Sequence, residues 1–267
     1  MTDPFQDVDS ASPELVELVV AALEARALED QMVPLVERYL ERLDWPDGAL
    51  HLEVGTGTGA IARRMAERAG GGTVLGVDPS RRLVESARRL AGDADDLRFE
   101  VGDGAALDLG DGSVENVVMH TVLSHVPEPE TLLREAARVL VPGGRLAVCD
   151  ADFEKSSLGN FDGDPLDACA EYFVRHFVTR PYLISELRRL VAAAGLAVEH
   201  FGVDSRTITD TDGGLAWVRM GTHRMVELGL IDARLAAALA DEYVRRKEAG
   251  TLYGHQPFGT LVAVKPA

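Results

Sequence analysis

The chain has 267 residues, of which 46% are hydrophobic, so it can bury a full core and is not disordered overall. Its 44 acidic and 27 basic residues give a formal net charge of −17. Nucleic acids and anionic membranes both attract basic surfaces, so this charge argues against either as a partner. The two cysteines are too few for a disulfide framework or a zinc cluster, and no bound metal is predicted.

The first elements are predicted to form a helical arm. Residues 1–12 are acidic, lack the features of a secretory signal and are predicted to be frayed. Pro13 opens a helical pattern that a second apolar stripe continues to about Leu43, with Pro34 inside it as a point of division. No apolar run is long enough to span a bilayer, so a cytoplasmic location is expected.

Strand and helix patterns alternate from residue 49 onward. Strands are predicted at 49–54, 73–77, 97–101, 114–119, 145–149, 196–201 and 260–264, and helices at 60–69, 80–90, 130–139 and 184–194. This alternation predicts a mainly parallel sheet with helices on both faces. Ligands of such sheets bind at the C-terminal ends of the strands, beside the point where strand order reverses.

Two insertions interrupt the alternation, at residues 153–179 and 207–257. The second is predicted to hold helices at about 214–228 and 232–248. Because insertions after strand ends overhang the ligand crevice, both are predicted to form a lid or a substrate wall. Within the second, residues 243–247 match the Tyr-x-x-x-Lys pattern of short-chain dehydrogenases, but we interpret them as the solvated face of a charged helix.

A glycine-rich stretch, HLEVGTGTGA at residues 51–60, joins the first predicted strand to its helix. Gly55, Gly57 and Gly59 permit a tight turn and let a ligand lie against bare backbone. The unpaired N–H groups of the helix start suit a carboxylate or a phosphate. The stretch also fits the dinucleotide fingerprint, so it does not by itself distinguish a nicotinamide cofactor from another adenosine cofactor.

Three acidic residues lie at successive predicted strand ends. Asp78, which follows Gly59 by 19 residues, is placed to accept hydrogen bonds from both hydroxyls of a ribose. Asp103 can accept a hydrogen bond from the exocyclic amine of adenine. Glu53, just before the glycines, would repel a pyrophosphate but attract an ammonium or a sulfonium. Together the three acids favour a cationic adenosine ligand over a nicotinamide dinucleotide.

These motifs, with the run LLREAARVLVPGGR at residues 132–145, resemble the ordered motifs of class I S-adenosylmethionine-dependent methyltransferases. The closer resemblance is to the bacterial small-molecule group that includes the quinone-ring methylases, and it covers roughly residues 50–201 and the terminal strand. It implies an α/β, Rossmann-like, doubly wound seven-stranded sheet whose last strand, 260–264, runs antiparallel. The helical N-terminal arm and the helical lid insertions are predicted from the residue patterns, and the insertions depart from the shared pattern of the family.

The predicted elements and the resemblance together give a domain organisation and a partner. Residues 1–48 would form the arm, residues 49–206 with 258–267 the S-adenosylmethionine-binding domain, and residues 207–257 the lid, with a smaller insertion at 153–180. The expected partner is a small-molecule acceptor, a natural product or a quinone-like compound, methylated on oxygen, nitrogen or carbon. A homodimer and a monomer are both compatible with the sequence.

The roles that the resemblance implies can be assigned residue by residue. The glycines would hold the methionyl part of S-adenosylmethionine, with Glu53 near its ammonium and Asp78 at the ribose. Asp103 and Gly104 would frame the adenine, while His120 and Thr121 would line the pocket near the sulfonium. The full expected cofactor set is Glu53, Gly55, Thr56, Gly57, Gly59, Asp78, Pro79, Leu83, Asp103, Gly104, Ala105, His120 and Thr121.

Methyl transfer is an in-line displacement for which the protein must align the reactants and exclude water, and it needs a base only if the nucleophile is protonated. His120 and His125 are the first candidates for that base, followed by His176, Tyr172, Asp150 and Asp152. Side chains of the two insertions are the candidate substrate wall: Tyr172, Phe173, Trp217, His223 and His255.

Other functions stay open on the sequence alone. The chain could bind S-adenosylmethionine without transferring its methyl group, or it could be a nicotinamide-dependent oxidoreductase. Aminopropyl transfer to a polyamine suits the acidic charge, but no extended glycine–aspartate motif follows the third strand. Nucleic-acid methylation is disfavoured because no Asn/Asp-Pro-Pro-Tyr stretch follows the fourth strand.

Overall fold

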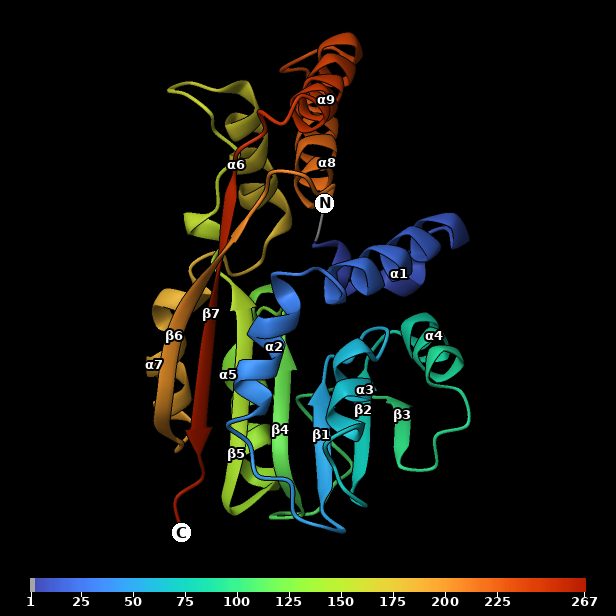
Figure 1. Cartoon of the computed structure of the whole chain (residues 1–267), viewed down its shortest axis with the longest axis vertical. Coiled ribbons are helices and arrows are strands. Elements are labelled where there is room, and N and C mark those ends of the chain that lie inside the picture. Colours follow the sequence, from blue (N-terminus) through green and yellow to red (C-terminus); the bar gives the residue numbers. More distant parts are fainter. Residues whose placement is uncertain (1–2) are drawn as a thin grey trace.

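The computed structural model describes residues 3–267 and contains a seven-stranded sheet in the order β3-β2-β1-β4-β5-β7-β6 (Figure 1). The first five strands in sequence pair in parallel where they are neighbours, and β7 runs antiparallel to both β5 and β6. The predicted sheet and its antiparallel last strand are therefore confirmed. The strands are β1 Leu50–Val54, β2 Thr73–Asp78, β3 Leu97–Val101, β4 Val114–His120, β5 Leu140–Ala151, β6 Ala197–Thr207 and β7 His255–Val264.

The helices that flank the sheet fall on two faces. Helices α2, α3 and α4 share one apolar cluster, and α5 and α7 share another on the opposite face. Strand β4 supplies both, because Val118 points into the first cluster while Val117 and Met119 point into the second. The helices are α1 Pro13–Ala27, α2 Met32–Leu40, α3 Ala60–Ala66, α4 Arg81–Ala91, α5 Pro129–Val139, α6 Pro165–Phe177, α7 Leu183–Ala193, α8 Gly213–Glu227 and α9 Ala233–Glu248.

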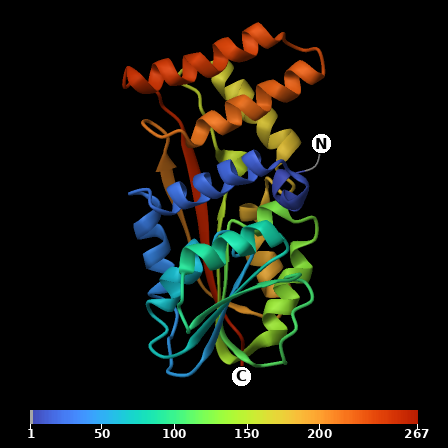
Figure 2. The same cartoon turned by 90° about the vertical axis from the view of Figure 1, so that its right-hand side faces the viewer.

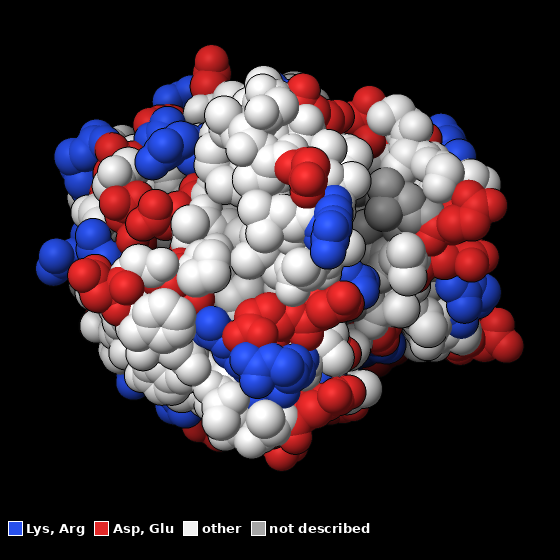
Figure 3. All heavy atoms as spheres, turned by 90° about the horizontal axis from the view of Figure 1, so that it is seen from above, with Lys and Arg blue, Asp and Glu red and all other residues white. Residues whose placement is uncertain are grey.

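The two insertions come together in a helical cap, which we define as α6, α8 and α9 (Figures 1 and 2). Strands β6 and β7 are longer than predicted, and their paired upper ends carry α8 and α9 above the sheet. A buried ion pair between Arg246 of α9 and Asp164 at the start of α6, 2.5 Å, joins the two insertions. Seen from above, the cap side of the molecule carries acidic and basic side chains interspersed (Figure 3).

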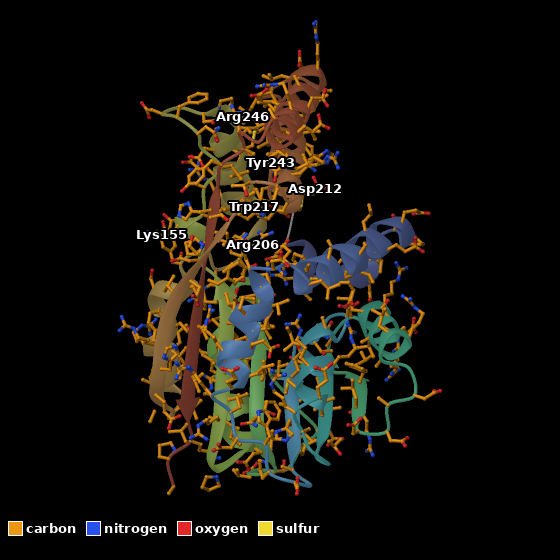
Figure 4. The ribbon with its side chains drawn as sticks, viewed as in Figure 1. Lys155, Arg206, Asp212, Trp217, Tyr243 and Arg246 are labelled. Carbon is orange, nitrogen blue, oxygen red and sulfur yellow. The ribbon has the colours of Figure 1, made fainter. Side chains whose placement is uncertain are left out.

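The interpretation of residues 243–247 as a solvated helix face is wrong for Tyr243 and Arg246, which are both buried. Tyr243 is fully buried, and its hydroxyl donates to the Thr211 carbonyl at 2.7 Å. Figure 4 shows Tyr243 with Trp217 and Arg246 inside the cap. Lys247 is paired with Asp212 at 2.6 Å. The charged neighbours of Tyr243 masked an inward-facing position on α9.

The prediction of a frayed N-terminus is also wrong for the described residues. Two short 3₁₀ helices, η1 Pro4–Gln6 and η2 Val8–Ser10, precede α1. Asp9 accepts hydrogen bonds from the backbone N–H groups of Arg81 and Arg82 and from the Ser80 hydroxyl, so it caps the start of α4. Residues 3–31, which we call the N-terminal segment, lie across the tips of the central strands (Figure 2). Residues 1 and 2 lie outside the described part of the chain.

One ion pair fastens the N-terminal segment to the base of the cap. Arg206, at the end of β6, is 4% exposed and donates two hydrogen bonds to Glu29, at 2.5 and 2.6 Å. Gln31 adds hydrogen bonds to Thr207 of the same strand. The geometry is the bidentate guanidinium–carboxylate arrangement that makes charge-assisted bonds strong.

Removing Glu29 is expected to destabilise the fold, because the buried Arg206 guanidinium would lose its countercharge. We expect Glu29→Ala to lower the free energy of unfolding by about 3 kcal/mol, measured by urea denaturation. The exposed pair Arg38–Asp204, at 2.8 Å, provides a matched control, and Asp204→Ala should cost less than about 1 kcal/mol. An equal loss of unfolding free energy in the two variants would contradict a structural role for the buried Arg206–Glu29 pair.

Candidate functional site

The main cavity of the described residues opens at the C-terminal ends of β1, β2 and β4, beside the reversal of strand order, with a volume of about 420 Å³. Its floor comes from the strand ends and the glycine loop, and its remaining wall from the N-terminal segment and α2. The residues that line it are Phe5, Gln6, Leu23, Arg26, Ala27, Met32, Val36, Glu53, Val54, Gly55, Thr56, Gly57, Thr58, Ala60, Ile61, Asp78, Pro79, Leu83, Asp103, Gly104, His120, Thr121, Val122, His125, Val126, Pro127 and Leu132.

The glycine loop is held in the tight form that its sequence predicts. Gly55, Gly57 and Gly59 all have positive φ, and the N–H groups of Gly55 and Thr56 donate to the Val77 carbonyl of β2. A Cβ atom at Gly59 would lie 2.6 Å from the Phe99 ring, so this glycine also allows close packing of α3 on the sheet. Gly59 does not line the cavity, whereas Gly55 and Gly57 do.

Glu53 is a buried carboxyl at the end of β1. Its Oε2 accepts a hydrogen bond from the Thr56 hydroxyl at 2.6 Å. The pKa of Glu53 is raised to about 8, mainly by burial and also by the nearby Asp78 carboxylate, while the Thr56 hydrogen bond acts in the opposite direction. A cation in the cavity would therefore find a group that is poised to lose its proton.

Asp78, at the end of β2, bridges the glycine loop and the start of α4. One carboxylate oxygen accepts from the Gly57 N–H at 2.8 Å and the other from the Ser80 N–H at 2.9 Å. Burial raises its pKa, and the two backbone bonds oppose that shift. Each oxygen keeps acceptor capacity for a further donor, which is the capacity that a ribose diol requires.

The third acidic residue stands at the outer end of the cavity. Asp103 is exposed and bonds the N–H of Ala105 at 2.8 Å. Gly104 is buried so closely against Val54 that an added Cβ would lie 2.4 Å from a Val54 methyl carbon. Asp103 and Gly104 line the cavity and Ala105 does not.

His120 closes the inner end of the cavity at the tip of β4. Its Nδ1 lies 3.2 Å from the hydroxyl of Tyr39 on α2. Burial lowers the pKa of His120 to about 3, with smaller contributions from the charges of Arg26 and Arg64. The imidazole is therefore neutral at physiological pH, and it is a weak proton acceptor.

His125 has a different environment from His120. Its Nδ1 lies 2.8 Å from the Asp3 carboxylate, which is buried and also accepts from the Thr179 hydroxyl at 3.1 Å. The Phe5 ring packs on the imidazole with centroids 4.7 Å apart, and Gln6 donates to the His125 carbonyl. A carboxylate on one ring nitrogen fixes the orientation of a histidine and leaves its other ring nitrogen free for a substrate.

The candidates taken from the two insertions do not line the cavity. Phe173 and Trp217 are buried and stack on each other with centroids 6.1 Å apart. His176 bonds the Tyr172 carbonyl within α6, and these two rings also stack. The remaining two lie on the cap and at its base, where exposed His223 pairs with Glu227 and His255 contacts Ser157. Of the described residues, none from the cap lines the cavity.

Several residues that line the cavity could not be assigned to the site from the sequence. Phe5, Gln6 and Arg26 belong to the N-terminal segment, and Met32 and Val36 to α2. Arg26 reaches the β4 tip, where its Nη2 donates to the Thr121 hydroxyl at 2.8 Å. Thr121 has φ of 55°, an unusual conformation for a β-branched residue and one that occurs at functional sites.

Within residues 3–267, no group of three or more His, Cys, Asp or Glu side chains is arranged to hold a metal ion. No helix there combines the length and apolar character needed to cross a membrane.

Comparison with known proteins identifies the region around the cavity. Residues 52–148 match the family described as "Methyltransferase domain". The chain is 30% identical over 225 residues to an uncharacterized 37.1 kDa protein in transposon TN4556 of Streptomyces fradiae, covering 84% of this chain and 65% of that protein. It is 38% identical over 130 residues to the 27-O-demethylrifamycin SV methyltransferase of Amycolatopsis mediterranei, covering 48% of this chain and 47% of that protein.

A third relative is the ubiquinone/menaquinone biosynthesis C-methyltransferase of Roseobacter denitrificans, 39% identical over 115 residues, covering 40% of this chain and 46% of the relative. The matches thus span less than two thirds of each relative.

Solved structures share the fold. A Bacillus halodurans protein superposes with a TM-score of 0.61 at 18% identity, covering 87% of this chain and 99% of that one. The Haemonchus contortus phosphoethanolamine N-methyltransferase 2 in complex with S-adenosyl-L-methionine superposes with a TM-score of 0.60 at 16% sequence identity. The superposition covers 100% of this chain and 61% of that one. With the motifs and the strand order in agreement, residues 52–148 form a methyltransferase domain within the seven-stranded sheet.

Proposed function

We propose that this protein transfers the methyl group of S-adenosylmethionine to an oxygen, nitrogen or carbon nucleophile of a small molecule, a natural product or a quinone-like compound. The observation that carries the proposal is the cavity at the strand tips, where Glu53, Asp78 and Asp103 lie in sheet order. The relatives that act on a rifamycin and in quinone biosynthesis support the class of acceptor.

The strand order arranges the three acids along the cavity in the sequence that the cofactor requires. Asp103 follows β3, Asp78 ends β2 and Glu53 lies in β1, and these strands are neighbours. Adenine, ribose and the cationic amino-acid part of S-adenosylmethionine occur in the same order along the molecule. An anion beside Glu53 would hold this buried carboxyl in its neutral form, whereas a cation would gain its charge, so the position favours an ammonium over the pyrophosphate of a nicotinamide dinucleotide.

The cavity also has groups that suit an acceptor. Phe5, Met32, Val36 and Val126 give it apolar lining, and His125 adds a polar group. S-adenosylmethionine, when bound, supplies a methyl group already activated by the sulfonium. The protein residues then have to orient the nucleophile and exclude water, and Phe5 and Gln6 of the N-terminal segment cover the cavity.

For a hydroxyl acceptor we assign the base to His125 and not to His120. The acceptor oxygen would form its bond to the methyl carbon as the carbon–sulfur bond breaks, and the hydroxyl proton would pass to the imidazole. Asp3 would stabilise the imidazolium that forms. His120, neutral and bonded to Tyr39, would line the cavity and contribute a hydrogen bond.

The direct test is transfer of label from methyl-labelled S-adenosylmethionine to a panel of phenols, quinols and polyketide alcohols, with formation of S-adenosylhomocysteine as the second readout. Binding of S-adenosylhomocysteine without transfer to any member would favour a cofactor-binding protein that has lost methyl transfer. Calorimetric binding of NADH and not of S-adenosylmethionine would overturn the proposal in favour of an oxidoreductase.

Asp78→Ala should weaken S-adenosylmethionine binding by roughly tenfold or more, because two hydrogen bonds to a charged group are lost. Isothermal titration calorimetry measures the change. Asp95→Ala, in the exposed turn before β3, is a matched control that should bind as the wild type does. Unchanged affinity in the Asp78 variant, with a normal thermal melt, would remove Asp78 from the cofactor site.

Cofactor binding should release a proton from Glu53. The raised pKa means that the free protein binds this proton up to about pH 8, whereas the cationic ligand favours the ionised carboxylate. Affinity should therefore rise with pH between 6 and 7.5, by up to about tenfold per pH unit. Glu53→Gln should abolish this slope in calorimetric titrations. A slope that is identical in the two proteins would contradict the linkage.

The same carboxyl gives a prediction for the stability of the ligand-free protein. Because the folded-state pKa of Glu53 lies above its usual value of 4.5, folding takes up a proton between pH 4.5 and about 8. Its contribution to stability is thus present at low pH and is lost as the pH rises through that window. Urea midpoints of wild type and Glu53→Gln should converge at low pH and diverge toward pH 8, with the variant the more stable.

The histidine assignment predicts different effects for the two residues on a hydroxyl acceptor. His125→Ala should reduce kcat by about a hundredfold or more, the usual contribution of a general base, with the affinity for S-adenosylhomocysteine changed little. His120→Ala should lower turnover more than cofactor affinity, but less than the His125 change does. A larger loss in the His120 variant would reverse the assignment.

A further inference from the structure

A second cavity, with a volume of about 220 Å³, lies between α2 and the paired strands β6 and β7. Arg38 and Arg42 line it from α2 and from the turn that follows this helix. His200 and Asp204 of β6 and Thr260 of β7 line it from the sheet. None of the residues around this cavity lines the main one, so a ligand held here would be separate from the methyl donor.

The second cavity is locally basic, although the whole chain has a formal net charge of −17. Its two arginines face a single carboxylate, because Arg38 pairs with Asp204 at 2.8 Å and no other acidic side chain lines the cavity. Among residues 3–267, Arg42 forms no ion pair with a carboxylate. Its guanidinium therefore keeps its N–H donors for a ligand, and Arg38 keeps those that Asp204 does not use.

A glycine on β6 places the imidazole of His200 in this cavity. A Cβ atom at Gly202 would lie 3.2 Å from the Nε2 of His200, so the ring lies close to the Gly202 backbone. Gly202 is also the register partner of Thr260, which brings the imidazole and the Thr260 hydroxyl to the same part of the cavity. Burial and the charge of Arg42 lower the pKa of His200, with Asp204 acting in the opposite direction. The imidazole is thus neutral at pH 7 and has one N–H to donate.

The hydroxyl of Thr260 is a buried polar group that calls for a partner. Thr260 is 6% exposed, and within residues 3–267 its Oγ1 has no hydrogen-bond partner except for the influence of the Cys149 thiol, which is only a weak one. Buried hydroxyl groups in folded proteins almost always form a hydrogen bond. An acceptor atom of a ligand in the cavity would satisfy this hydroxyl.

We propose that the second cavity binds the phosphate group of a small molecule, with Arg38, Arg42, His200 and Thr260 as its donors. Guanidinium groups match the geometry of phosphate oxygens, and charge-assisted hydrogen bonds of this kind are strong. Donors from four side chains on three elements exceed what the two oxygens of a carboxylate can use, which favours the phosphate. The inference goes beyond methyl transfer, because it assigns a second ligand to a separate part of the protein.

The test titrates the full chain with inorganic phosphate at constant pH and ionic strength and follows the imidazole resonances of His200 by NMR, assigned from the spectrum of His200→Gln. The wild type should show a saturable shift, and acetate should bind at least a few-fold more weakly than phosphate. Arg42→Gln should weaken phosphate binding by about fivefold or more, since a charge-assisted hydrogen bond is lost. Arg89→Gln, on the exposed face of α4, is the matched control and should bind as the wild type does.

A second variant should strengthen binding, which a damaged fold would not produce. Asp204→Asn removes the carboxylate that competes for Arg38, so phosphate affinity should rise by a few-fold. The inference is overturned if the wild type shows no saturable shift of His200, or if Arg42→Gln and Arg89→Gln bind phosphate equally. Acetate binding as tight as that of phosphate would also overturn it. So would full competition with S-adenosylhomocysteine, because that result would place the phosphate in the main cavity.

Discussion

The site depends on the burial of two carboxyl groups, Glu53 and Asp78, at the ends of neighbouring parallel strands. Burying like charges so close together is unfavourable, and the fold offsets part of that cost with donors from the glycine loop: the Gly57 N–H bonds Asp78 and the Thr56 hydroxyl bonds Glu53. The remaining imbalance appears as the raised pKa of Glu53. A cationic ligand would offset the repulsion between these two carboxyl groups. Their burial therefore destabilises the free protein and favours the protein with a cation bound.

The N-terminal segment completes what the sheet leaves open. It caps α4 through Asp9, orients His125 through Asp3 and brings Arg26 to the β4 tip. These contacts place charged groups on the side of the cavity that the strand ends cannot reach. The N-terminal segment therefore lines the site as well as covering it, and its polar side chains form hydrogen bonds with residues around the site.

Much of the fold could be predicted from the sequence because its signals are local. The alternating apolar patterns located the strands and helices, and the glycines with Glu53, Asp78 and Asp103 located the cavity, since parallel strands bring their C-terminal ends to one edge. The contributions of Asp3 and Arg26 could not be predicted, because their partners lie 122 and 95 residues away and no local pattern links them. Tyr243 was misjudged because its charged neighbours dominate the sequence around it, and the difference between His120 and His125 depends on burial.

The cap does not line the cavity, yet it is not independent of it. Glu29, which pairs with Arg206 at the base of the cap, is three residues from Arg26 in the same segment. A shift of the upper ends of β6 and β7 would pull on Glu29 and Gln31, and through them on the last turn of α1. The position of Arg26 is thus mechanically tied to the position of α8 and α9.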